Sequence, residues 1–268
     1  MNRLISFITA LIVFTSCASL KPNPNTTSTS TLRILTYNIH HANPPSKPEG
    51  EIDLTAICKV LKDANPDLIA LQEVDSNTIR SGNIDQAKEI AEQLDMHYYF
   101  AKAIDFQGGS YGQAILSRYP IITAQTIPLP DDAVPENEDR IVASTTISLP
   151  NNKTIRFAST HLDASSVENR LLQVARIKEL GQGEQALPFI IAGDFNASKK
   201  SKPIRRLQEQ FDLGCSHCEF TSPAQGPIRT IDFIAINKAH PCRVLSYQVI
   251  HETYASDHLP ILASVEIP

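Results

Sequence analysis

The sequence predicts a mixed α/β fold in which two β-sheets pack against each other. Short apolar runs typical of strands occur in clusters, and amphipathic helical stretches lie between the clusters instead of after every strand. Such a pattern differs from the regular strand and helix alternation that indicates a purely parallel sheet. Polar residues gather where the apolar runs end, which is typical of active sites carried on loops.

Before residue 160 the sequence predicts two helices and a series of strands. The helices cover 53–65 and 86–94. In the first, apolar residues recur at helical spacing and Asn65-Pro66 ends the helix. Asn151-Asn152 predicts a hairpin turn. The strands are predicted over 32–38, 67–74, 98–103, 112–117, 121–128, 141–149 and 154–159.

The remaining chain adds helices over 167–180 and 203–210 and a second group of strands. The clearest strand covers 189–193, where an apolar run ends in a glycine. The other strands are predicted over 230–236, 243–249 and 259–266. The strongest polar signals of the whole chain fall at strand ends or just after them.

Composition limits the function only weakly. The chain is 42% hydrophobic, enough for a sizeable core, and its length suits one large domain. Its formal charge of −5 and pI near 5.9 argue against the basic footprint of a nucleic-acid-binding protein. A nonspecific nuclease would still need only a local basic patch. The candidates for that patch, which otherwise form a solvated helix face, are Lys199, Lys200, Lys202, Arg205 and Arg206.

Residues 1–16 read as an export signal. Arg3 precedes an apolar stretch of about ten residues, which is too short to span a bilayer. Ser16-Cys17 then gives the arrangement of a bacterial lipoprotein, with Cys17 as the site of lipid attachment. Cleavage after Ala18 by an ordinary signal peptidase is the alternative reading.

Residues 17–31 are rich in Pro, Asn, Ser and Thr and predict a flexible, lipid-anchored tether. Residues 32–268 then form the folded domain. We therefore expect an exported bacterial lipoprotein in the cell envelope, at the outer membrane or in the periplasm, with secretion as the alternative. The expected membrane contact is the lipid alone, and the protein is expected to be a monomer.

Four cysteines remain after Cys17. Cys58 lies in an apolar helical pattern and is expected to be inert core. Cys215 and Cys218 have the spacing of a zinc half-site or a redox pair, but no second such pair follows. In an exported protein a disulfide is favoured, either Cys215–Cys218 or one of these two with Cys242.

Polar residues mark the ends of several apolar runs. Asp194 and Asn196 follow the run that ends at Gly193, and residues two apart in a strand face the same side. Glu73 ends another such run, and Asp257-His258 lies near the C-terminus. Carboxylates with a histidine and no thiolate suit a hard cation such as Mg²⁺ and an anionic substrate. That combination indicates phosphate ester hydrolysis.

Seven motifs occur in order along the chain. They are LTYNIHH at 35–41, LQEVD at 71–75, YGQAILSR at 111–118, STHLD at 159–163, GDFN at 193–196, TIDFI at 230–234 and SDH at 256–258. Together they resemble the endonuclease/exonuclease/phosphatase superfamily, which includes nucleases, inositol phosphatases and sphingomyelinases. The resemblance covers roughly 32–268. It implies a four-layer α/β/β/α sandwich of two packed mixed sheets, with the active site at one end.

The resemblance also implies a metal site and a catalytic set. Glu73, Asn38 and Asp257 match metal-binding residues around Mg²⁺, with Mn²⁺ as an alternative ion. Asp194 matches the carboxylate that orients or deprotonates the attacking water, and Asn196 matches the amide that binds phosphate in the transition state. His258 matches the histidine beside the scissile phosphate, and Asp232 matches the acid that orients a catalytic histidine. His161 matches the histidine that donates to a phosphate oxygen.

Other residues in the motifs keep open roles. Asp75 and Asp163 are expected to be structural or surface acids, and Arg170 is expected to be structural. His40 and His41 have two possible roles: one of them contacts the site, or both have a structural or solvent-facing role. Gln113 stands where many relatives have asparagine, and its longer side chain changes the reach of the amide.

The predicted function is an exported, lipid-anchored, Mg²⁺-dependent phosphoesterase acting on phosphodiester or phosphomonoester bonds. Phospholipids, sugar or inositol phosphates and nucleic acid are the candidate substrates, nucleic acid as substrate only. The alternatives are a nonspecific extracellular nuclease and a catalytically inactive surface binding module. The binding module is disfavoured, because binding alone does not require a water-activating set of carboxylates and histidines.

Overall fold

The computed structural model describes residues 30–134, 137–182 and 187–268. Its strands, in chain order, are β1 (Ser30–Asn38), β2 (Leu68–Ser76), β3 (His97–Phe106), β4 (Gly109–Ser117), β5 (Ile121–Pro128), β6 (Ile141–Ser148), β7 (Thr154–His161), β8 (Phe189–Asp194), β9 (Phe211–Leu213), β10 (Asp232–Asn237), β11 (Arg243–Val249) and β12 (Ile261–Ile267). The helices are α1 (Leu54–Ala64), α2 (Gln86–Leu94), α3 (Val167–Gln182) and α4 (Lys202–Leu207), with single turns η1 (His40–Ala42) and η2 (Pro150–Asn152).

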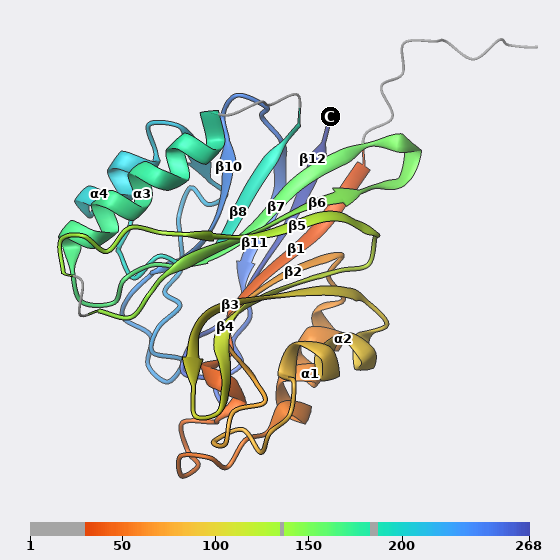
Figure 1. Cartoon of the computed structure of the whole chain (residues 1–268). Helices are drawn as coiled ribbons and strands as arrows, with labels where there is room; N and C mark the ends of the chain where they lie inside the picture. Colours follow the sequence, from red (N-terminus) through yellow and green to blue (C-terminus); the bar gives the residue numbers. More distant parts are fainter. Residues whose placement is uncertain (1–29, 135–136, 183–186) are drawn as a thin grey trace, which may run out of the picture.

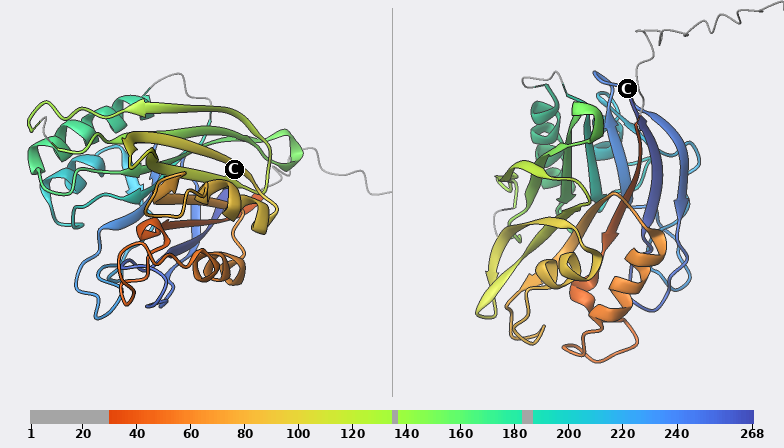
Figure 2. Two further views of the ribbon diagram at one scale, coloured as in Figure 1. Left: turned by 60° about the horizontal axis from the view of Figure 1, so that its bottom comes forward. Right: turned by 90° about the vertical axis from the view of Figure 1, so that its right-hand side faces the viewer.

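The strands form two mixed sheets of six strands each. The first has the order β11-β12-β1-β2-β4-β3 and the second β5-β6-β7-β8-β10-β9. Each contains one parallel pair, β1–β2 and β7–β8. Figures 1 and 2 show α1 and α2 outside the first sheet and α3 and α4 outside the second. The predicted four-layer α/β/β/α sandwich is confirmed.

Strand β8 shows how the layers divide the apolar residues. All of its residues are buried. Ile190 and Ala192 belong to the core between the two sheets, and Phe189 and Ile191 to the core beneath α3 and α4. Because successive side chains of a strand point to opposite faces, a strand covered on both faces is apolar throughout. A third core lies between the first sheet and its two helices.

Capping residues set the ends of α1. The Asp53 carboxylate accepts a hydrogen bond from the Ala56 backbone N–H at 3.0 Å, satisfying one of the free donors of the first turn. Asn65 ends the helix in the left-handed conformation, with its backbone N–H donating to the carbonyls of Leu61 and Lys62. The predicted helix 53–65 is therefore this helix with its two caps.

The strand boundaries differ from the predicted ones where local sequence is a poor guide. Strand β12 begins at Ile261 instead of 259, because Pro260 has no N–H to donate to a ladder. Helix α4 ends at Leu207, three residues before its predicted end, and β9 begins at Phe211 after the turn at 208–210. The sequence pattern missed β9 because three residues carry too little periodicity. The predicted turn at Asn151-Asn152 is confirmed within η2, where Asn152 has φ +59°.

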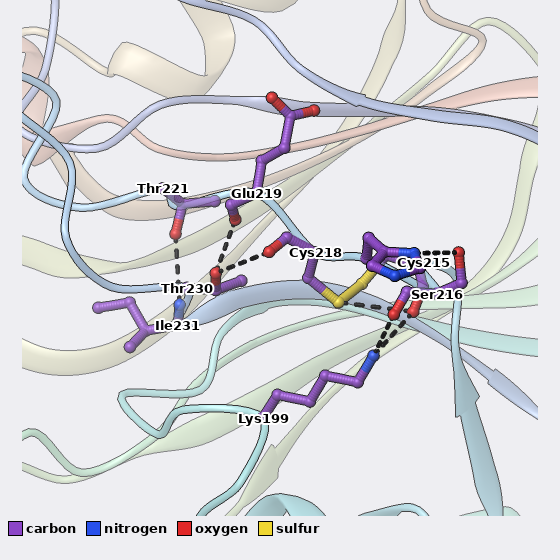
Figure 3. Close-up of a disulfide and its surroundings, with 9 residues drawn as sticks. Lys199, Cys215, Ser216, Cys218, Glu219, Thr221, Thr230 and Ile231 are labelled. Carbon is purple, nitrogen blue, oxygen red and sulfur yellow. Dashed lines mark hydrogen bonds between the residues drawn. A yellow bond between two sulfur atoms is a disulfide. The ribbon is translucent and has the colours of Figure 1, made fainter.

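Cys215 and Cys218 form a disulfide, with Cα atoms 5.1 Å apart, which decides between the pairings left open by the sequence (Figure 3). Cys58 is buried and Cys242 is a free thiol. The Lys199 ammonium donates to the carbonyl oxygens of Cys215 and Ser216 at 3.2 and 2.8 Å. One member of the predicted basic patch therefore has a structural contact with the disulfide loop.

The predicted signal, Cys17 and most of the tether lie outside the described residues. Ser30 and Thr31, predicted as the end of the tether, belong instead to β1 and pair with Ile267 and Glu266. Within the ranges that the structure describes, no helix is both long enough and apolar enough to cross a membrane.

Candidate active site

Three of the predicted catalytic residues lie in one row at the ends of neighbouring strands. His161, the last residue of β7, is paired in register with Asp194, the last residue of β8. Asp232, the first residue of β10, pairs with Asp194 from the other side. Because β7 and β8 are parallel and β10 is antiparallel to β8, these three ends coincide at one edge of the second sheet.

The first sheet contributes Asn38 and Glu73 to the same place. Asn38 ends β1 and is in register with Gln72 of β2. The pairing of β2 with β4 shifts between Gln72 and Val74, so that Glu73 is the extra residue of a β-bulge, with φ +57°. Bulges redirect a side chain, and a non-glycine residue in this conformation is uncommon and costs energy. The strained position is occupied by the predicted metal ligand.

The Asn38 amide joins the two sheets. Its Nδ2 donates to Glu73 Oε1 at 2.9 Å and to Asp194 Oδ2 at 3.3 Å. Asn38 and Asp194 are each 1% exposed, so this link is made away from solvent. Hydrogen bonds to charged acceptors are stronger than neutral ones, and a buried amide left without them would be costly.

Gly193 allows the close approach of β7 and β8 at the site. A β-carbon at this position would collide with the Thr160 carbonyl oxygen, so only glycine fits. After Asp194 the strand ends and Asn196 adopts φ +47°. Its backbone N–H donates to Asp194 Oδ1 at 2.8 Å, and its side-chain amide donates to the Leu162 carbonyl at 3.0 Å. A turn therefore places Asn196 beside Asp194. The sequence predicted that the two residues would lie together, but the strand alternation from which this was argued does not apply, because β8 ends at Asp194.

Asp194 Oδ2 is the point on which the site converges. His161 Nε2 lies 3.6 Å from it and His258 Nε2 lies 3.7 Å from it. These separations exceed a normal hydrogen bond, so a water or a phosphate oxygen that contacts both groups would bridge them from the side. The arrangement provides a carboxylate flanked by two imidazole groups.

His258 is held by Asp232. The carboxylate oxygens of Asp232 accept from His258 Nδ1 at 3.0 and 3.1 Å, which leaves Nε2 directed at Asp194. Burial alone lowers the pKa of His258. The charge and hydrogen bonds of Asp232, helped by Asp194 and Asp257, outweigh burial and raise that pKa to about 10. The ring is therefore cationic near neutral pH.

His161 is held in the opposite state by Arg140. A guanidinium group has no acceptor, so the contact of 3.2 Å between Arg140 Nη1 and His161 Nδ1 requires Nδ1 to accept and Nε2 to carry the proton. Burial lowers the pKa of His161 well below its usual range, with smaller contributions from Arg140 and His258. Glu138 contacts Arg140 at 2.8 Å. The sequence did not predict Arg140 or Glu138, since Glu138-Asp139-Arg140 reads like any charged turn before a strand.

Burial raises the pKa of Asp194 to about 7, with a further increase from Asp232. His258 and the hydrogen bonds from Asn196 and Asn38 partly offset this rise. A carboxyl group with such a pKa can accept a proton near neutral pH. A bound divalent cation would favour the carboxylate form and bring the pKa down.

The oxygen donors near Asn38 fit a hard divalent cation. Asn38 and Glu73 offer amide and carboxylate oxygens, the ligands that Mg²⁺ prefers. Asp257 is connected to them through Ser256, whose hydroxyl lies 2.7 Å from the Asn38 carbonyl oxygen and 3.4 Å from Asp257 Oδ1. Asp194, Asp232 and His258 also have ligand atoms within 4.8 Å of one another. Asp232 is already occupied by His258, so the donors at Glu73 suit a metal better.

The remaining motif residues lie apart from this centre. Asp75 accepts a two-pronged hydrogen bond from Arg80 at 2.8 and 2.9 Å, and Asp163 caps the turn before α3 through the Ser165 and Ser166 backbone N–H groups. Arg170 donates to the Asp163 carbonyl at 2.7 Å. These three residues have the structural contacts that were expected of them.

Gln113 faces the interior and does not reach the open part of the site. It is 2% exposed, and its Nε2 donates to the Ile141 carbonyl at 3.0 Å. His40 and His41, in contrast, lie next to Glu73. Burial lowers the pKa of His41 to about 4, with smaller contributions from Arg80 and His40, so this ring is neutral.

The two-sheet sandwich with buried carboxylates and histidines at one end is the architecture of a hydrolase fold. The chain belongs to the endonuclease/exonuclease/phosphatase family, whose family model matches residues 35–258. The uncharacterized protein YbhP of Escherichia coli strain K12 is 26% identical over 265 residues, which cover 91% of this chain and 100% of YbhP.

Solved structures show the same fold. An endonuclease/exonuclease/phosphatase family protein from Bacteroides thetaiotaomicron superposes with a TM-score of 0.75 at 18% identity, covering 90% of this chain and 99% of that one. A mannosyl-6-phosphatase from the same organism superposes with a TM-score of 0.71 at 20% identity, covering 87% and 99% of the two chains. At these identities the likeness concerns the fold alone.

Proposed function

We propose that this protein is a divalent-metal-dependent phosphoesterase that uses Asp194 to activate the attacking water. The convergence of Asn38 Nδ2, His161 Nε2 and His258 Nε2 on Asp194 Oδ2, at 3.3, 3.6 and 3.7 Å, carries this proposal. A merely structural cluster would close the two wider gaps, between the histidines and Asp194, with direct hydrogen bonds, because buried polar groups left apart are costly.

Water held at Asp194 Oδ2 gives up a proton to the carboxylate as its oxygen attacks phosphorus. The ester bond opposite to it breaks, and the alcohol oxygen leaves with the bonding electrons and takes up a proton from solvent. His161, neutral and with its proton on Nε2, donates a hydrogen bond to a phosphate oxygen. His258, cationic through Asp232, stabilises the negative charge that gathers on the phosphate in the transition state. The side-chain amide of Asn196 is held by the Leu162 carbonyl, so its expected contact with phosphate requires a rotation of the side chain.

A divalent cation held by Glu73, Asn38 and Asp257, with Mg²⁺ as the expected ion and Mn²⁺ as the alternative, supplies charge stabilisation to the phosphate when bound. The chain's own contribution is to hold Glu73 in the strained bulge conformation and to fix its oxygen with the Asn38 amide. Both features keep the carboxylate in place before substrate arrives.

The proposed substrate class is a small phosphate ester, with sugar and inositol phosphates ahead of nucleic acid. The fold is shared with a mannosyl-6-phosphatase. The acidic balance of the chain and the structural use of Lys199 argue against a nucleic-acid groove. Export and lipid attachment at Cys17 complete the proposal and place the enzyme in the cell envelope.

The test is a hydrolysis panel with the mature protein in Mg²⁺ or Mn²⁺. The panel contains p-nitrophenyl phosphate, its bis ester, mannose 6-phosphate, inositol phosphates, sphingomyelin and plasmid DNA. Release of phosphate or p-nitrophenol that stops when a chelator is added supports the proposal. Cleavage of DNA alone would replace it with the nuclease, and no hydrolysis of any compound by a folded protein would favour the binding module.

A further inference from the structure

Two histidines outside the proposed catalytic set lie beside Glu73. His40 and His41 follow β1 by one residue, and one ligand atom from each lies within 4.8 Å of the other and of a Glu73 carboxylate oxygen. Two imidazoles and one carboxylate at such separations are a donor set for a transition-metal ion. No step of the proposed hydrolysis uses either histidine.

The backbone here is strained in a way that brings the two rings together. His40, His41 and Ala42 have φ values of +46°, +42° and +58°. The left-handed conformation costs roughly 1–2 kcal/mol for each residue that has a β-carbon. Neighbouring residues of an extended chain point to opposite sides, whereas these ring centroids are 4.5 Å apart. Conformations that cost this much persist mainly at functional sites.

The hydrogen bonds of the two rings leave ligand nitrogens free. His40 Nδ1 lies 2.8 Å from the Asn43 carbonyl oxygen, so it donates its proton there and leaves a lone pair on Nε2. A backbone carbonyl on the second ring nitrogen is the usual support of a metal-bound histidine. His41 is 6% exposed, and neither of its ring nitrogens has a hydrogen-bond partner. A buried ring with two unpartnered nitrogens is rare and points to a missing ligand.

The two histidines form part of the wall of one cavity, and both ring nitrogens of His41 are themselves buried. The cavity has a volume of about 310 Å³ and is also lined by Asn43 and Lys47 among others. Metal–ligand bonds of about 2.0–2.1 Å in tetrahedral geometry place the ligand atoms about 3.4 Å apart. From separations of up to 4.8 Å, the side chains of Glu73 and of the half-buried His40 need to close by as much as about 1.4 Å, which requires side-chain rotation.

We propose that His40 Nε2, one ring nitrogen of His41 and Glu73 bind a transition-metal ion such as Zn²⁺ or Co²⁺. Imidazole ligands favour these ions over Mg²⁺, which prefers oxygen. The ion is additional to the one proposed at Asn38, Glu73 and Asp257, and Glu73 bridges the two positions. Paired metals sharing ligands, about 3.5–4 Å apart, occur in many phosphoesterases. The inference shares Glu73 with the proposed function but concerns binding, which does not depend on turnover.

The test measures Co²⁺ binding to chelator-treated mature protein in saturating Mg²⁺, by calorimetry and by the visible absorption of Co²⁺. Wild-type protein should bind one Co²⁺ per chain with a spectrum typical of nitrogen ligands. His40→Asn and His41→Asn should each weaken binding by ~10–100-fold or more, since each removes a ligand. Asparagine is chosen because it tolerates the left-handed conformation. His251→Asn is the matched control, because it removes an exposed histidine that contacts Glu219 at 3.7 Å.

Thermal melts separate ligand loss from misfolding. Co²⁺ should raise the melting temperature of wild type and of His251→Asn but not that of His40→Asn, whose side chain is only half-buried. Unchanged Co²⁺ affinity in His40→Asn would overturn the inference. Complete loss of Co²⁺ binding by the wild-type protein in saturating Mg²⁺ would also overturn it, because both ions would then share one site. A protein that binds Co²⁺ but hydrolyses nothing refutes only the proposed function. A Mg²⁺-dependent enzyme that binds no Co²⁺ refutes only this second site.

Discussion

Replacing Asp232 by asparagine tests the proposal that His258 acts as a cation and His161 as a neutral hydrogen-bond donor. The Asp232 carboxylate accepts from His258 Nδ1 through both oxygens and carries most of the charge that keeps this buried ring cationic. Asparagine has nearly the same shape but no charge. Its amide either accepts from Nδ1 with a neutral oxygen or, when reversed, donates to Nδ1 and imposes the wrong tautomer. In both cases His258 loses the charge proposed to stabilise the transition state.

The size of the effect follows from the pKa of His258, which is raised from 6.5 to about 10. This pKa shift of about 3.5 units corresponds to a preference of about 5 kcal/mol for the cation. A folded-state pKa above the unfolded one gives stability that is fully present below about pH 6.5 and is lost as the pH rises toward about 10. In Asp232→Asn, burial alone acts on the ring and the pKa should fall to 6.5 or lower. At about pH 8 the cationic fraction should then drop from nearly all molecules to a few per cent, and the rate by ~30-fold or more.

The assay is the pH dependence of single-turnover hydrolysis from about pH 5 to about pH 10, together with a proton NMR titration of the metal-free histidines. The alkaline limb of the rate should move down by roughly 3.5 units in Asp232→Asn. Asp105→Asn is the control, because Asp105 is an exposed acid paired with Lys102. An unchanged titration of His258 in Asp232→Asn, or an unchanged alkaline limb, would refute the proposed role of the pair.

Four further changes test other parts of the site. Glu73→Ala should abolish Mg²⁺-dependent turnover, and full activity at saturating Mg²⁺ would remove Glu73 from the metal site. Arg140→Met should lower kcat by ~10-fold or more with little change in KM, because His161 loses its fixed tautomer; equal effects on both constants would point to substrate binding. Gly193→Ala should lower the free energy of unfolding by about 3 kcal/mol or more in denaturant titrations, since its β-carbon collides with Thr160. Cys17→Ser should release the protein from the membrane fraction, and a soluble wild type beginning at Ser19 would disprove lipidation.

The fold was predictable because its signals are local. Helix α1 was predicted from apolar residues at helical spacing. Asp53 and Asn65, residue types that favour helix ends, cap its two ends. Strand β8 is an unbroken apolar run from Phe189 to Ala192, because both of its faces are covered. Strand β9 gave no such signal, since a three-residue strand is defined by its partner β10 and hardly at all by its own sequence.

The candidate site was predictable in its residues but not in its geometry. The motif around Gly193 located Asp194 and Asn196, yet the turn that places Asn196 depends on a left-handed conformation that no glycine or proline marks. Nothing in the sequence predicted the bulge at Glu73 either. Arg140 could not be found because its role depends on His161, 21 residues away and on a neighbouring strand. A sequence pattern predicts which face of a strand or helix a residue occupies, but not which distant residue it contacts.

A site made from two sheets needs those sheets held in one relative position, and an apolar interface alone does not provide it. Hydrophobic burial is not directional, so it fixes the relative position of two faces less tightly than hydrogen bonds do. Next to the site, however, Gln72 of the first sheet donates to Ser159 Oγ of the second at 2.9 Å, and that hydroxyl lies 3.3 Å from the Leu71 carbonyl oxygen. Asn38, the register partner of Gln72, repeats this connection at the site itself through its link to Asp194. A slide of the sheets would break both links and leave buried polar groups unpaired, so the bonds that fix the packing also keep Glu73 and Asp194 facing one another.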